Sequence, residues 1–117
     1  MEDEEMLKKW GLLLFLSIFL SACSKMNGEY EMSEKIHSIE QIVNEPNWEQ
    51  IQSLGDELKQ LHKQNEWKIQ LLGDEDEYES LQESINNLLV AIEEKDLTET
   101  KLELSTIKTY LDDIYSL

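Results

Sequence analysis

The stretch GDEDEYESLQESINNLLVAIEEKDLTETKLELSTIKTYLDDI, residues 73–114, decides the fold of this chain. Leucine and isoleucine recur along it at intervals of three and four, the period of an α-helix with one apolar face. Gly73 suits the end of a preceding helix, and Asp74 suits a helix start with three further acids in the first turn. Lys95-Asp96 interrupts the pattern. The stretch therefore predicts two amphipathic helices, whose apolar faces consist of Tyr78, Leu81, Ile85, Leu88 and Ile92, and of Leu97, Leu104, Ile107, Leu111 and Ile114.

Two more amphipathic helices are predicted ahead of this stretch. The earlier one ends at Asn44-Glu45-Pro46, because the residue before a proline avoids helical geometry. Asn47 is a suitable cap for the later one, which continues through Trp67 to Leu72. Their apolar faces consist of Met32, Ile36, Ile39 and Val43, and of Trp48, Ile51, Leu54, Leu58 and Leu61. Helices of this kind with short connections pack against one another. We therefore predict an all-α fold, an antiparallel bundle of three to four amphipathic helices after an N-terminal signal helix.

The N-terminal signal helix is predicted from residues 10–22, WGLLLFLSIFLSA, which carry no charge. A helix needs about 20 apolar residues to cross a bilayer, whereas a run of about 10–14 is typical of the core of a signal peptide. Lys8 and Lys9 precede the run and the small residues Ser21 and Ala22 close it, as in a signal peptide with a cleavage site. A retained membrane anchor and a buried core helix are the alternatives.

The apolar run ends in Leu20-Ser21-Ala22-Cys23, which resembles the lipobox of bacterial lipoproteins. The resemblance implies that diacylglycerol is attached to the Cys23 sulfur, that a peptidase cuts between Ala22 and Cys23, and that Cys23 becomes the lipidated N-terminus. The alternative is a lone structural cysteine. An exported protein with one odd thiol needs an explanation for it, and lipidation supplies one.

The sequence thus predicts three segments. Residues 1–22 form a lipoprotein signal peptide, residues 23–31 the lipidated cysteine and a polar tether, and residues 32–117 the helical bundle domain. The four consecutive acids of residues 2–5 have the wrong sign for the start of a signal peptide, whereas translation from Met6 gives the conventional opening MLKKWGLLL. We predict that Met6 is the true start.

The charge of the chain excludes some partners. The formal net charge is −16, from 26 acidic residues and 10 basic ones, all lysine. A chain this acidic repels the phosphate backbone, so we expect no binding to nucleic acid. Removal of residues 1–22 takes away four acids and two lysines and leaves −14. We expect this charge to hold the domain off anionic lipid and the membrane lipid on Cys23 to serve as the anchor.

Candidate catalytic and metal-binding residues are few. The two histidines, His37 and His62, have no neighbouring ligands at zinc spacing, and we expect both to be solvated surface residues. No serine lies in a G-x-S-x-G turn and no glycine-rich phosphate loop occurs, so no enzyme and no cofactor is predicted. The acidic turn of residues 74–77 is the best cation candidate, with Asp74 and Asp76 as ligands, although helix capping explains it without a metal.

The aromatic residues are predicted to be structural. Trp48 and Trp67 lie 19 residues apart on one predicted helix, about 28 Å along its axis, too far for a shared pocket. We expect both to pack against the core or the ends of the bundle. The same expectation holds for Tyr110 and Tyr115.

Several stretches resemble the family of the domain of unknown function 4363: NWEQI at residues 47–51, Trp67, GDEDEYESL at 73–81, and LLVAIEEKDLTETKLELSTIKTYLDDI at 88–114. This family consists of short bacterial proteins, common in spore-forming Firmicutes, with an N-terminal hydrophobic segment and a helical domain. The resemblance implies a helical fold and no particular activity.

We therefore expect a lipid-anchored protein on the extracytoplasmic face of the cell membrane of a Gram-positive bacterium, acting as a non-catalytic interaction or structural module with an envelope protein as its partner. The alternative is an accessory lipoprotein that binds a small ligand or a cation.

Overall fold

The computed structural model describes the backbone of residues 2–25 and 28–116, and the side chains of residues 3–15 and 28–116. These residues form five helices and no strand, so the all-α prediction is confirmed. The helices are α1 (Glu2–Lys25), α2 (Gly28–Ile42), α3 (Trp48–Leu72), α4 (Glu75–Glu93) and α5 (Leu97–Tyr115).

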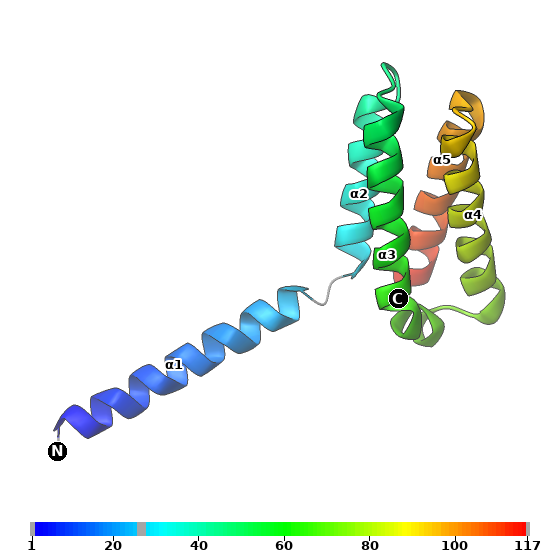
Figure 1. Ribbon diagram of the computed structural model, residues 1–117. Coiled ribbons are helices and arrows are strands. Elements are labelled where there is room, and N and C mark those ends of the chain that lie inside the picture. Colours follow the sequence, from blue (N-terminus) through cyan, green and yellow to red (C-terminus); the bar gives the residue numbers. More distant parts are fainter. Residues whose placement is uncertain (1, 26–27, 117) are drawn as a thin grey trace.

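Helices α2 to α5 pack as an antiparallel four-helix bundle (Figure 1). Short turns connect them, so neighbouring helices run in opposite directions. Helix α2 packs against α3 and α5, and α4 packs against the same two helices, so the four surround one core. In consequence, the start of α2, the end of α3, the start of α4 and the end of α5 lie at one end of the bundle. We call this the proximal end, because it is the end nearer to Cys23, and the opposite one the distal end.

The predicted apolar faces form the core. The fully or almost fully buried core residues are Met32, Ile36, Ile39, Ile51, Leu58, Ile69, Leu81, Ile85, Leu88, Ile92, Leu104, Ile107, Leu111 and Ile114. Trp48, Leu54, Leu61 and Tyr78 pack against this cluster from its edge. Burial of these faces is the main stabilising contribution, because each large apolar side chain removed from water is worth about 1.5–3 kcal/mol.

The helix boundaries follow the caps in the sequence. The side-chain oxygens of Asn47 and Asp74 accept hydrogen bonds from the N–H groups of Gln50 and Glu77, at 3.2 and 2.8 Å. Both predicted caps are therefore confirmed. Asp96 caps α5 in the same way, and Lys95 before it has a φ of 57°, which reverses the chain between α4 and α5.

Two glycines permit close helix contacts. Gly55 faces α4, and a Cβ atom there would lie 3.1 Å from Cδ1 of Ile92 and 3.2 Å from Cδ2 of Leu89. Gly28 is buried against α3, and a Cβ atom there would overlap the side chain of Asn65. Because glycine has no side chain, Gly55 lets α3 approach α4 closely and Gly28 lets α2 approach α3 closely.

The bundle begins earlier than the sequence indicates. Residues 28–31, expected in the polar tether, form the first turn of α2, and Gly28 and Met32 are both buried. Residues 24–27 are what remains between Cys23 and the bundle. The apolar face that the sequence shows starts at Met32. Gly28 lies inside the polar stretch ahead of it, and nothing in that stretch indicates that the helix has already begun.

Helix α1 lies apart from the bundle (Figure 1). Its described side chains, residues 3–15, are all exposed, including Trp10 and Leu12 to Phe15. Among the residues that the structure describes, no helix combines the length and the apolar character that crossing a bilayer requires. The described part of the apolar run, residues 10–15, therefore contributes nothing to the core.

Candidate functional site

The predicted lipidation and cleavage residues lie near the end of α1. The backbone of Ala22 and Cys23 is helical, while their side chains lie outside the described residues. The prediction for these two residues therefore stays a prediction. What the structure adds is that residues 24–27 alone separate Cys23 from α2.

The acidic turn at the start of α4 acts as a helix cap. The Asp74 carboxylate accepts a hydrogen bond from the N–H of Glu77, and Asp76 is exposed to solvent. A hollow of about 310 Å³ beside the turn is lined by Gln70, Asp74, Glu75, Tyr78 and Glu79. Within the described parts of the chain, no three Asp, Glu, His or Cys residues are grouped so that they could hold a metal ion. The capping geometry accounts for the position of Asp74.

The two histidines differ. His37 is exposed on α2, where its Nε2 lies 3.1 Å from Nε2 of Gln41. The prediction that His62 is a surface residue is wrong, because it is only 3% exposed. Position 62 follows Leu61 on the predicted stripe of α3. Because α3 packs against α2, α4 and α5, its buried face is wider than one stripe.

His62 is enclosed without a hydrogen-bond partner on Nε2. Its ring stacks on that of Tyr78 in α4, with centroids 6.2 Å apart and planes inclined by 20°. Burial lowers the pKa of His62, and the negative charge of Glu66 on the same helix partly opposes this effect. The imidazole is therefore neutral at pH 7 and packs as an aromatic side chain.

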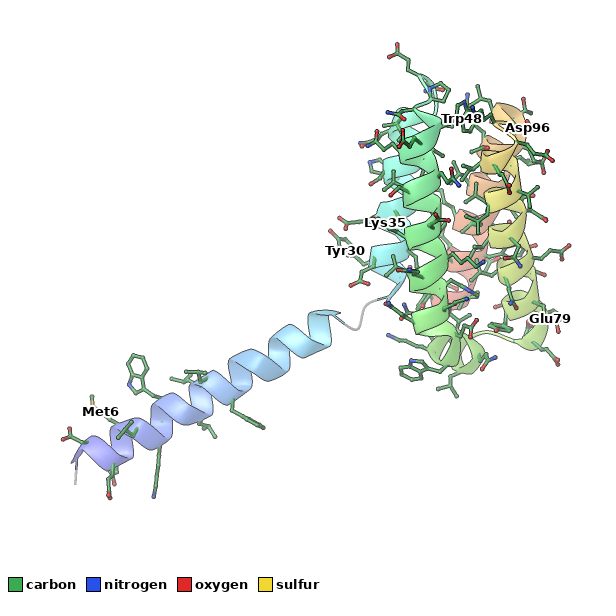
Figure 2. The ribbon with its side chains drawn as sticks, viewed as in Figure 1. Met6, Tyr30, Lys35, Trp48, Glu79 and Asp96 are labelled. Atoms are coloured by element: carbon green, nitrogen blue, oxygen red, sulfur yellow. The ribbon has the colours of Figure 1, made fainter. Side chains whose placement is uncertain are left out.

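The tryptophans also differ. Trp48 packs against the core at the distal end, beside the α4–α5 turn that contains Asp96 (Figure 2). Trp67 is 55% exposed, so the expectation that it packs is wrong. By helical period it lies opposite the stripe of Ile51 and Leu58, on a side of α3 that the neighbouring helices do not cover.

The predicted packing of Tyr110 and Tyr115 is confirmed, since both lie against the edge of the core. The hydroxyl of Tyr115 is buried without a hydrogen-bond partner. Burial, with a smaller effect of the charge on Glu29, raises the pKa of this phenol.

The structure brings together one polar cavity that the sequence reasoning missed. It has a volume of about 250 Å³ and lies between α4 and α5. Its lining consists of Ser80, Glu83, Ser84, Asn87, Glu103, Thr106 and Tyr110. All seven side chains are polar and none of the seven is cationic. The signal was present in the sequence, because the lining residues recur at helical spacing beside the apolar stripes of both helices.

Glu103 and Ser84 form the floor of this cavity. Glu103 is 9% exposed and Ser84 is 4% exposed, and the Ser84 hydroxyl donates a hydrogen bond to the Glu103 carboxylate. A carboxylate taken out of water is costly unless other groups satisfy it. One hydroxyl satisfies only part of its hydrogen-bonding capacity, because a carboxylate accepts about four hydrogen bonds. The floor is therefore suited to a ligand that donates hydrogen bonds and carries positive charge.

A second cavity, of about 310 Å³, lies between α2 and α5 and has mixed character. Lys101 and Lys108 line it together with Glu40, the buried Val43 and Leu104, and the polar Asn44 and Ser105. Nζ of Lys108 lies 3.2 Å from Oε1 of Glu40, so this pair is neutralised within the chain. The charge that remains in the lining of this cavity is that of Lys101, which favours an anion over a cation.

Comparison with known proteins identifies a family. A family model described as "Domain of unknown function (DUF4363)" matches residues 21–117. Searches of curated proteins and of solved structures gave no match. The matched region contains all four helices of the bundle and begins two residues before Cys23.

Proposed function

The chain belongs to the DUF4363 family, and on that premise we propose that it is a lipid-anchored protein of the cell envelope with a non-catalytic role in interaction or structure. The lipid is attached to Cys23 and holds the bundle on the extracytoplasmic face of the cell membrane of a Gram-positive bacterium. The observation that carries this proposal is the sequence LSAC at the end of a lysine-led apolar run, directly ahead of a separately packed bundle.

The separation of α1 from the bundle supports the removal of residues 1–22. A segment that is cut off must not contribute to the core of what remains. The described apolar side chains of α1, from Trp10 to Phe15, are exposed and add nothing to the core. The family match also begins at Ser21, so the part shared with the family excludes most of the apolar run.

The distal end supports a role in interaction. Val90 near the end of α4 and Leu102 near the start of α5 are 53% and 56% exposed. Both lie in the half of the α4–α5 hairpin that is farther from Cys23, where a second envelope protein has access. A partner that covers these two side chains gains the free energy of removing their apolar area from water.

The anchoring step is tested by replacing Cys23 with alanine in the producing bacterium. We expect the natural chain to incorporate labelled palmitate and to fractionate with membranes, and Cys23→Ala to lose the label. Ser24→Ala is the matched control, because it changes the next residue and leaves LSAC intact. Unchanged labelling of Cys23→Ala would defeat the proposal.

The interaction role is tested by isolating the protein from solubilised membranes. We expect one protein to accompany it in stoichiometric amount. Val90→Glu with Leu102→Glu should remove this partner, while Glu79→Ala at the opposite end of α4 should retain it. The absence of any stoichiometric partner would favour the second function below.

A second candidate function is the binding of a small cation in the cavity between α4 and α5. The buried Glu103 carboxylate favours this function, because the lining adds a second carboxylate, Glu83, and no positive side chain. The cavity volume of about 250 Å³ is several times the roughly 30 Å³ that one water occupies. A small organic ammonium with hydroxyl groups fits this space and its acceptors better than a bare metal ion.

Ethanolamine is a suitable probe for the cavity. We expect it to raise the thermal unfolding midpoint of the natural protein, while uncharged ethylene glycol has no effect. Glu103→Gln keeps the size of the side chain and should remove the response to ethanolamine. An equal response in both proteins would exclude the cavity as the site.

A further inference from the structure

The last turns of α3 extend past the start of α2 at the proximal end. Gly28, the first residue of α2, lies against Asn65 of α3, since a Cβ atom on the glycine would overlap the Asn65 side chain. The two helices are antiparallel, so α3 continues for residues 66–72 beyond this contact. Seven helical residues span about 10 Å. We call residues 66–72 the α3 overhang.

The overhang exposes two large apolar side chains. Trp67 is 55% exposed, and Leu71, at 77%, is the most exposed large apolar side chain among the described residues. They are four residues apart and therefore lie on one face of α3. Ile69, between them in sequence, is fully buried in the core. The outer face of the overhang is thus apolar, and its inner face holds it rigidly on the bundle.

The chain places a membrane beside this face. Residues 24–27 connect Cys23 to Gly28, and the five residue steps from Cys23 to Gly28 span at most about 18 Å. With lipid on Cys23, the start of α2 lies within this distance of the headgroups, and the overhang adjoins it through the contact of Gly28 with Asn65. If residues 10–22 were instead retained in the bilayer as an anchor, the membrane would lie at the same end of the bundle.

We propose that the overhang inserts Trp67 and Leu71 into the headgroup region of the membrane, so that the bundle rests on the lipid through the end of α3. This inference rests on the proposed anchoring. Indole is suited to this position, because it has an apolar body and one N–H donor, and tryptophan gathers at membrane interfaces for that reason.

The charge of the proximal end limits the depth of this contact. Asp74, Glu75 and Asp76 are exposed at the start of α4, next to the overhang in sequence. Anionic lipid repels these carboxylates within a Debye length of about 8 Å. The contact is therefore shallow and strongest on zwitterionic lipid. The rest of the acidic domain stands away from the surface, as its net charge requires.

The two tryptophans of the bundle allow a direct test. Trp10 is replaced by phenylalanine throughout, so the result is the same whether or not residues 1–22 are removed. Trp48→Phe then leaves Trp67 as the single fluorophore, and Trp67→Phe leaves Trp48. Each protein is purified from membranes and placed in phosphatidylcholine vesicles whose acyl chains carry bromine near the headgroup, which quenches nearby indole fluorescence.

We expect quenching of Trp67 to be several-fold stronger than that of Trp48, because Trp48 lies about 28 Å farther along α3. Leu71→Asp should weaken the quenching of Trp67, while Val90→Asp at the distal end should not. If Trp67 is not quenched, or is quenched no more than Trp48, in protein that floats with the vesicles, the proposal is overturned. A second copy of the chain or α1 covering Trp67 would give this result. Strong quenching of Trp67 in protein that carries no lipid on Cys23 would support the membrane contact and reject lipid anchoring through Cys23. Protein that does not float with the vesicles would reject both the contact and the anchoring.

Discussion

The two ends of α3 carry the same residue type in opposite situations. Trp48 packs against the edge of the core, whereas Trp67, on the same helix, is 55% exposed. The helical period distinguishes them, because Trp48 lies at the edge of the stripe that Ile51 and Leu58 form, whereas Trp67 lies on the opposite side of α3. The side of α3 that carries Trp67 faces away from the core along the helix, since Asp56, Gln60 and Lys63 on that side are exposed as well. An apolar residue is thus buried only where its helical phase turns it toward the neighbouring helices, as for Ile69, which is fully buried two residues after Trp67.

The largest expected effect separates the packed middle of α3 from its overhang. Leu58 is fully buried and Leu71 is 77% exposed. We expect Leu58→Ala to cost about 2–5 kcal/mol of unfolding free energy, because it removes buried atoms and leaves a cavity. Leu71→Ala should change stability by less than about 0.5 kcal/mol. Thermal unfolding followed by circular dichroism measures both, and equal losses would break the comparison.

The register between α2 and α3 is tested at Gly28. Gly28→Ala introduces a Cβ atom into space that the Asn65 side chain occupies, and we expect a loss of about 1–3 kcal/mol. The double variant with Asn65→Ala should recover part of that loss, because the smaller side chain frees the space. Denaturant unfolding supplies the free energies. If Gly28→Ala is neutral, α2 does not meet α3 at Asn65 and the overhang has a different length.

Removal of the cap at the start of α4 should have a moderate effect on stability. We expect Asp74→Ala to lower stability by about 1 kcal/mol, because the Glu77 N–H loses its acceptor. Asp76→Ala is the matched control, since Asp76 is exposed and caps nothing, and it should stay near the natural value. Thermal unfolding with and without calcium is informative as well. A midpoint raised by calcium in the natural protein but not in Asp74→Ala would show that the turn is a cation site and not only a cap.

The smallest effect concerns pH. Burial lowers the folded-state pKa of His62, so the unfolded chain binds a proton first as the pH falls. Stability is therefore highest above the ordinary histidine pKa of about 6.5 and decreases as the pH falls through that value toward the folded-state pKa. His62→Phe should remove this loss and keep the stack on Tyr78, while His37→Phe should retain it. Unfolding curves between neutral pH and the start of carboxylate titration check this, and a natural protein that gains stability over this range would contradict it.

Sequence patterns were sufficient where the cause is local. The caps Asn47 and Asp74 act within three residues, and the apolar faces follow from the helical period, so both were predicted correctly. The burial of His62 and the early start of α2 depend on which helices meet and where, whereas the exposure of Trp67 follows from its position opposite the apolar stripe of α3. The cavity around Glu103 has the same origin, because it exists only where the polar flanks of α4 and α5 lie opposite each other.

The central claim is that Cys23 is the lipidated N-terminus of the mature protein. Mass spectrometry of the protein extracted from membranes and digested with a protease tests it most directly. We predict an N-terminal peptide that begins at Cys23 and carries a diacylglyceryl group on its sulfur, with no peptide from residues 2–22. An unmodified Cys23 inside a peptide that continues from Ala22 would contradict the claim.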